Sequence, residues 1–142
     1  ALIFMGRRGW KADALYKRIA AHPEGGKRFL FIESANDSEL ELAFSQTVAL
    51  ISPSLDEGFG LPLIEAALHD VPSIVSDISV YHEVAGNGAM YFKLHDIDSF
   101  CSAIREVSLW SESERKAHAK QVHIGTWEQG AWDILYALSQ KD

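Results

Sequence analysis

The stretch VALISPSLDEGFGLPLIEAALHDVPSIVSDISVYHEVAGNGAMYF, residues 48–92, alternates short apolar runs with helical patterns. Its apolar runs predict strands at 48–52, 72–76 and 89–92, with helices at about 61–68 and 80–84 between them. Strands that alternate with helices in this way are typical of a parallel sheet covered by helices. Because the run at 48–52 is apolar on both faces, we expect it to be a central strand of that sheet.

The same alternation continues on both sides of this stretch. Before it, we expect strands at 2–5 and 28–32 and helices at about 11–21 and after Asn36, where Glu39 completes a capping box. After it, we expect helices at about 97–107, 113–122 and 127–138. The sequence therefore predicts one α/β domain over residues 1–142, with helices on both faces of a parallel sheet and a helical C-terminal segment.

Composition excludes several classes of protein. The 142 residues carry a net charge of -7 and show no basic stripe, so we expect no nucleic-acid partner. The single cysteine, Cys101, rules out an internal disulfide and fits a reducing, cytoplasmic location. No apolar run approaches the roughly 20 residues of a membrane span. The chain opens on a strand-like run without Met, and we interpret it as a segment of a longer protein.

The loop after the run at 48–52 carries the candidate binding site. Ligands of open α/β sheets bind beyond the carboxyl ends of the strands. Glycines directly before a helix let a ligand approach the backbone, and the free N–H groups of the helix start attract phosphate. The candidate residues are Glu57, Gly58, Phe59, Gly60, Leu61 and Glu65. Neither the dinucleotide pattern GxGxxG nor the P-loop pattern occurs, so NAD and P-loop chemistry are disfavoured.

Two carboxylates beside a phosphate site need an explanation, because like charges repel. Ionised carboxylates accept hydrogen bonds from hydroxyl groups, so Glu57 and Glu65 fit a ligand with hydroxyls on both sides of its phosphates. A nucleotide sugar has this layout. A tight strand-to-helix turn that leaves both carboxylates exposed accounts for the same residues, and the two interpretations stay open on chemistry alone.

The spacing of these residues resembles a known family. Glu57 to Glu65 resembles the E-x7-E signature of the large retaining glycosyltransferase family called family 4, or group 1. The order of strands, acidic loop and helices is similar over residues 1–108, and MGRRGW at 5–10 resembles a bacterial branch that includes mannosyl- and rhamnosyltransferases. The resemblance implies a GT-B enzyme with two Rossmann-like halves. This chain resembles the C-terminal, donor-binding half, without the acceptor-binding half.

The resemblance also implies roles for single residues. Glu57, the expected catalytic residue, would accept hydrogen bonds from the donor hexose, and Glu65 would accept them from the ribose hydroxyls. The backbone amides of residues 58–61 would face the sugar and the diphosphate. The basic pair of the family lies upstream in this branch, so we expect Arg7 and Arg8 to be distinct from it, and a direct contact of either with phosphate stays open.

The function implied is retaining transfer of a hexose, with mannose suggested by the branch, from a nucleoside-diphosphate sugar to a glycan or lipid-linked acceptor in surface polysaccharide synthesis. No cofactor and no metal are expected, because the six histidines are scattered without metal-ligand spacing. The acceptor would bind through the missing domain, so we expect the isolated segment to be inactive. Peripheral association of the longer enzyme with a membrane is compatible with this interpretation.

Two other functions stay open. A non-catalytic Rossmann-like module that binds a nucleotide or a protein partner is the main alternative, and a buried structural salt bridge of Glu65 would favour it. A sugar phosphorylase or an epimerase of the same architecture is the weaker one.

Several positions depart from the family pattern or lie outside its motifs. Asp70 stands where glycine often ends the helix, and we expect it to adopt the left-handed turn at some cost. Tyr81-His82 replaces a frequent Leu-Pro, and we expect a structural role for His82 rather than an acid/base pair with Glu83. Tryptophans are expected to anchor the first loop, at Trp10, and to pack on the last helices, at Trp110, Trp127 and Trp132.

Overall fold

The computed structural model describes residues 1–9 and 11–140, with the side chains at 127 and 133 excepted, so the prediction for Trp10 lies outside the described residues. The chain forms two compact units, residues 1–45 and 46–142. The single domain expected over 1–142 stays a prediction.

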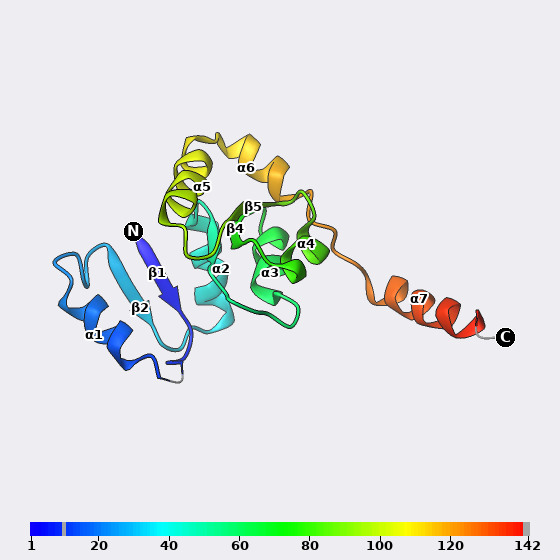
Figure 1. Ribbon diagram of the computed structural model, residues 1–142, viewed down its shortest axis with the longest axis horizontal. Coiled ribbons are helices and arrows are strands. Elements are labelled where there is room, and N and C mark those ends of the chain that lie inside the picture. Colours follow the sequence, from blue (N-terminus) through cyan, green and yellow to red (C-terminus); the bar gives the residue numbers. More distant parts are fainter. Residues whose placement is uncertain (10, 141–142) are drawn as a thin grey trace. The chain divides into compact units, whose positions relative to one another are not determined.

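The first unit is a two-stranded parallel sheet with its connecting helix. Its elements are β1 (Leu2–Met5), α1 (Asp13–Ala21), β2 (Phe29–Ile32) and α2 (Asp37–Gln46), the last of which ends at the first residue of the second unit (Figure 1). Leu2 lies opposite Phe29 and Met5 opposite Ile32. At the start of α2, the Glu39 amide donates to Asn36 Oδ1 at 3.0 Å and the Asn36 amide donates to Glu39 Oε2 at 2.9 Å, which confirms the predicted capping box.

The second unit contains a three-stranded parallel sheet in the order β3-β4-β5. Its strands are β3 (Leu50–Ser52), β4 (Ser73–Ser76) and β5 (Ala89–Phe92), and its helices are α3 (Leu61–Leu68), α4 (Ser79–Ala85), α5 (Ile97–Leu109), α6 (Glu112–Ala119) and α7 (Trp127–Ser139). The predicted parallel α/β class is confirmed.

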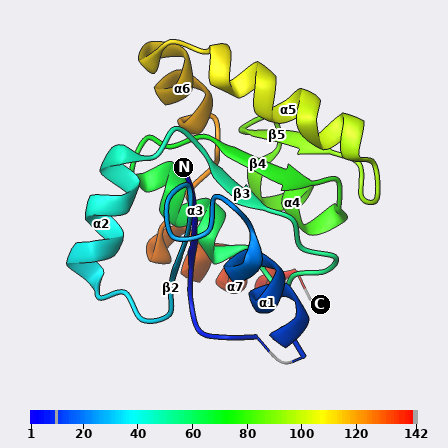
Figure 2. The same ribbon diagram turned by 90° about the vertical axis from the view of Figure 1, so that its left-hand side faces the viewer.

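Side chains of the sheet alternate between two apolar clusters, as the pleat requires. Ile74 of β4 packs with Ala103 and Val107 of α5, whereas its neighbour Val75 packs with Leu63 of α3 and Tyr81 of α4. Figure 2 shows α5 on one side of this sheet and α3 and α4 on the other. The prediction of helices on both faces is therefore confirmed.

One prediction about the sheet is wrong. Among the described strands, β3 lies at the edge of its sheet and its residues are only half-buried, whereas β4 is central and buried throughout. The apolar run at 48–52 suggested burial on both faces, but β4 combines Ile74 and Val75 with two small serines and fits between two neighbouring strands.

Helix α3 ends in a left-handed turn that is formed by an aspartate in place of glycine. Asp70 adopts a φ of 58°, the Asp70 amide donates to the Ala67 carbonyl at 3.1 Å, and the Val71 amide donates to the Ala66 carbonyl at 2.9 Å. This is the Schellman arrangement, and it confirms the left-handed turn expected of Asp70.

The packing expected of the tryptophans is confirmed at Trp110, which packs beside the α5 cluster, with its ring centroid 4.6 Å from that of His118. Trp132 on α7 is exposed, together with Ile134, Leu135 and Tyr136, so the packing expected of it stays a prediction, and the side chain of Trp127 lies outside the described residues. Within the described part of the chain, none of the helices is long and apolar enough to span a bilayer.

Candidate functional site

Helix α3 begins at a glycine that no other residue could replace without strain. Gly60 is the N-cap, with a φ of 82°, and the Leu63 amide donates to its carbonyl at 2.9 Å. A left-handed φ favours glycine because side chains at other residues collide with the backbone. Pro62, in the first turn, has no N–H to leave unpaired. The predicted glycine turn and helix start are therefore both present.

The start of α3 is left open to a ligand. In the described part of the chain, no side chain caps this helix, and its first turn contains no acidic residue. Phe59 is 56% exposed and Leu61 is 62% exposed, so the chain on either side of Gly60 is accessible. Helix N-termini carry unpaired N–H groups and a partial positive charge, and they bind phosphate groups well.

Glu57 is held in place by the loop itself. It is half-buried, the Ser54 hydroxyl donates to its Oε1 at 2.7 Å, and its amide donates to Asp56 Oδ1 at 3.0 Å. The sequence interpretation missed Ser54. The spacing Ser-x-x-Glu, which brings a hydroxyl onto a carboxylate three residues later, was a signal for it.

Glu65 lies one turn further along α3. Its side chain is exposed, so the buried salt bridge that would have favoured a non-catalytic module is not formed. Residues i and i+4 share a helix face, which places Glu65 on the same exposed face as Leu61. The loop and helix thus place Glu57, residues 58–61 and Glu65 in one continuous segment, with a carboxylate on each side of the glycine turn.

The turn after β4 lies at the same edge of the sheet. Asp77 follows β4 directly, its Oδ1 lies 2.7 Å from Nε2 of His82, and the His82 ring stacks on Tyr91 with centroids 4.0 Å apart. Burial, and then the negative charge of Asp77, raise the pKa of Tyr91. His82 is therefore paired with Asp77 rather than with its sequence neighbour Glu83. The sequence interpretation missed this pairing of residues five positions apart, and the stacking of His82 on Tyr91 depends on how β5 lies beside β4.

Arg8 has two partners within the first unit. Arg8 Nε lies 2.7 Å from Glu33 Oε1, and its guanidinium carbon lies 5.0 Å from the centre of the Tyr16 ring. The Arg8 and Glu33 side chains are both exposed, so this ion pair contributes little to stability. A contact of Arg7 or Arg8 with phosphate stays a prediction.

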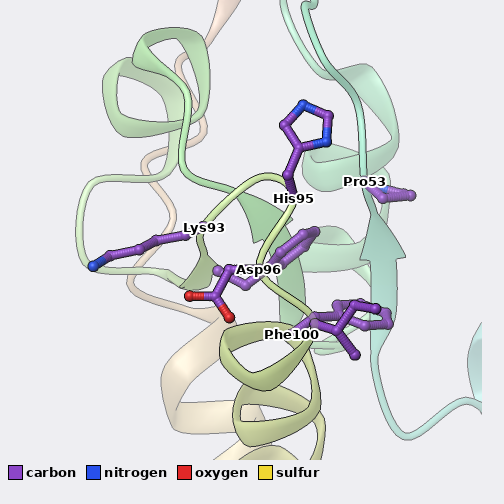
Figure 3. Close-up of a pocket in the computed structure, with 7 residues that line it drawn as sticks. Pro53, Lys93, His95, Asp96 and Phe100 are labelled. Atoms are coloured by element: carbon purple, nitrogen blue, oxygen red, sulfur yellow. The ribbon is translucent and has the colours of Figure 1, made fainter.

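A small cavity of about 180 Å³ lies at the carboxyl ends of β3 and β5. Its walls include Pro53, Phe92 and Phe100, and the ammonium group of Lys93 points away from them (Figure 3). Ligand pockets combine apolar walls with a few converging polar groups, and this cavity lacks the second feature. In the residues that the structure describes, no group of three or more His, Cys, Asp or Glu side chains is placed to hold a metal ion.

Comparisons with known proteins identify relatives of this chain. The family model described as "Glycosyl transferases group 1" matches residues 1–121. The serotype-specific mannosyltransferase WbdA of Escherichia coli is 35% identical over 140 residues, covering 96% of this chain and 17% of that protein.

Two further relatives make the same point. The O-antigen chain mannosyltransferase RfbU of Salmonella typhimurium is 47% identical over 77 residues, covering 54% of this chain and 22% of that protein. The O-antigen chain mannosyltransferase B of Escherichia coli is 32% identical over 135 residues, covering 89% of this chain and 34% of that protein. The chain thus spans between about a sixth and a third of the length of these relatives.

The family match covers most of the chain, including the glycine turn, Glu57 and Glu65. The chain therefore belongs to the group 1 glycosyl transferases.

Proposed function

We propose that this chain is the donor-binding part of a retaining glycosyltransferase that transfers a hexose from a nucleoside-diphosphate sugar to a glycan or lipid-linked acceptor. The observation that carries the proposal is the open start of α3 at Gly60, flanked by the carboxylates of Glu57 and Glu65. Mannose is the hexose favoured, because the relatives WbdA and RfbU are named as mannosyltransferases. Surface polysaccharide synthesis is the context favoured, because RfbU is named for the O-antigen chain.

The chemistry proposed is stabilisation of a leaving group. The bond between the sugar anomeric carbon and the diphosphate oxygen breaks, and the diphosphate gains negative charge. Amides of residues 58–61 at the start of α3 would stabilise that charge as it develops, which lowers the barrier. The acceptor hydroxyl attacks the anomeric carbon from the face that the diphosphate leaves, and its proton passes to the departing phosphate oxygen or to water.

The two carboxylates would hold the donor at its ends. Glu57, oriented by Ser54, would accept hydrogen bonds from hexose hydroxyls and fix the anomeric carbon for attack. Glu65 would accept hydrogen bonds from the ribose hydroxyls. We propose that neither a metal nor a cofactor is needed, because helix N–H groups and basic residues neutralise the diphosphate. A cytoplasmic reaction, with the longer protein at a membrane surface, is the setting that the donor and a lipid-linked acceptor favour.

The experiment that tests this proposal uses the full-length protein with a panel of nucleotide sugars. We expect release of nucleoside diphosphate and transfer of the sugar from GDP-mannose, with the anomeric configuration retained and with no loss of rate in EDTA. If the protein binds the nucleotide sugar but neither hydrolyses it nor transfers the sugar to a glycan or lipid-linked acceptor, the result would instead support a non-catalytic module. A rate abolished by EDTA and restored by a divalent cation would contradict the metal-free mechanism.

A further inference from the structure

A buried tyrosine of α4 lies directly against the glycine that starts α3. Tyr81 is 1% exposed, and a Cβ atom built on Gly60 would lie 2.8 Å from Tyr81 Cε1. Contacts that short do not occur between real carbon atoms, so the Tyr81 ring occupies the space that a side chain at residue 60 would need. The ring therefore fixes how closely the end of the loop approaches α4.

The hydroxyl of the same side chain contacts the other end of the loop. Tyr81 Oη and Ser52 Oγ lie 2.5 Å apart, and Ser52 is the last residue of β3. The Tyr91 hydroxyl of β5 lies 2.7 Å from the Gly86 carbonyl and 3.1 Å from the Tyr81 carbonyl, so its one proton is donated to either carbonyl or shared between them. Tyr81 thus joins the two ends of the segment 53–60, while its own backbone is anchored to β5.

We propose that Tyr81 is a positioning residue that sets the direction of the anion-binding turn at the start of α3. This inference rests on the proposed function. The segment 53–60 is held internally by the contacts of Glu57 with Ser54 and Asp56, and residues 58 and 59 are exposed. The conformation of such a segment depends on where its two ends are fixed. Tyr81 fixes both ends with one rigid ring, so the amides of 58–61 keep one orientation toward a diphosphate.

The position of Tyr81 explains why its hydroxyl matters separately from its ring. The ring alone keeps the packing beside Gly60 and in the apolar cluster with Leu63 and Val75. The hydroxyl alone ties that packed ring to the end of β3. Tyr81→Phe therefore keeps the fold and the contact with Gly60, but it removes the contact between the ring and the Ser52 hydroxyl at the start of the loop.

The first arm of the test follows amide hydrogen exchange in the full-length protein without ligand. We compare wild type with Tyr81→Phe, Ser52→Ala and the double variant, and use Tyr136→Phe, whose ring on α7 is 68% exposed, as the matched control. We expect amides of residues 54–61 to exchange several-fold faster in each single variant than in wild type. In the double variant they should exchange no faster than in either single variant. The control should leave them unchanged. Unchanged exchange of this segment in Tyr81→Phe would overturn the inference.

The second arm measures transfer below the melting transition of each variant. Because one side-chain hydrogen bond contributes roughly 1 kcal/mol, we expect Tyr81→Phe to raise KM for the nucleotide sugar about fivefold, with KM for the acceptor unchanged. A purely structural role would lower the melting temperature and leave the donor KM as it is, which would overturn the inference. If the wild-type protein transfers no sugar, the proposed function fails, and the exchange measurement still decides the role of Tyr81 in the loop.

Discussion

Two helices of the second unit begin in opposite ways. Helix α6 starts at Ser111, whose hydroxyl accepts the Glu114 amide at 3.3 Å while Glu114 Oε2 accepts the Ser111 amide at 2.7 Å. Glu112 and Glu114 add negative charge to its first turn. Helix α3 starts at Gly60 with neither a capping side chain nor an acid in its first turn. The sequence thus closes one helix start with its own side chains and, among the described residues, leaves the other without a side-chain cap.

The absence of a side-chain cap lowers the stability of a helix start and leaves its amides available to an anion. A capping side chain is worth about 0.5–2 kcal/mol compared with Ala, so an uncapped helix start gives up part of that stability. The amides that remain unpaired can then bind an anion, and the helix dipole favours negative charge at the same place. The start of α6 therefore provides a comparison for the start of α3.

The largest effect is expected at Gly60. Gly60→Ala puts a Cβ at a φ of 82° and 2.8 Å from a buried ring, so we expect a loss of about 2–4 kcal/mol from the left-handed conformation and the overpacking together. Urea unfolding followed by circular dichroism measures it. Gly58→Ala is the matched control, since a Cβ there meets no atom within 4 Å and should change stability by less than about 0.5 kcal/mol. Equal losses at the two glycines would contradict the steric account.

A smaller effect is expected at the closed helix start. Ser111→Ala removes the hydroxyl that accepts the Glu114 amide, and we expect a loss of about 1 kcal/mol in the free energy of unfolding. The affinity of the full-length protein for a nucleoside diphosphate should stay within twofold of wild type, because α6 is not part of the proposed site. If Ser111→Ala weakened nucleotide binding without lowering the free energy of unfolding, the contrast drawn between the two helix starts would be wrong.

The smallest effect is a pH dependence at the far end of α6. Burial lowers the pKa of His118 from 6.5, although a hydrogen bond with the backbone of Gly88 and the charge of Glu106 act in the other direction. Its Nδ1 is buried and has no hydrogen-bond partner within the described part of the chain. Because the pKa is lower in the folded state, the unfolded state binds more protons as the pH falls through about 6.5. Stability should therefore be complete above that pH and decrease below it.

The measurement for His118 is the midpoint of urea unfolding between pH 7.5 and pH 5. We expect His118→Gln to flatten part of the decrease that wild type shows over this range. An identical slope in the two proteins would show that the neutral form of His118 is not favoured by folding.

Local signals were sufficient for much of this fold. The apolar run Leu2–Met5, the box at Asn36 and Glu39, and the glycine turn before Pro62 each occupy the positions predicted from sequence. Such features depend on a few neighbouring residues, so periodicity and turn chemistry predict them.

What sequence could not supply depends on residues far apart in the chain. The edge position of β3 follows from which strands pair with one another. A run of residues that is apolar on both faces does not determine this strand pairing. The contacts of Tyr81 with Ser52 and Gly60, and the stacking of His82 on Tyr91, depend on how α4 packs against the sheet. The contact of Ser54 with Glu57 was also missed, but it could have been predicted, because the spacing of the two residues is visible in the sequence.

The most direct test of the central claim is calorimetric titration of the full-length protein with the bare nucleoside diphosphate, in wild type, Glu65→Gln and Glu57→Gln. Charge-assisted hydrogen bonds contribute about 1.5–3 kcal/mol each, so Glu65→Gln should weaken binding at least tenfold. Glu57→Gln should leave this affinity within twofold of wild type and lower only the turnover of the intact donor, because the hexose is absent from the diphosphate. Equal affinities of the two variants for the diphosphate would contradict the assignment of ribose to Glu65 and hexose to Glu57.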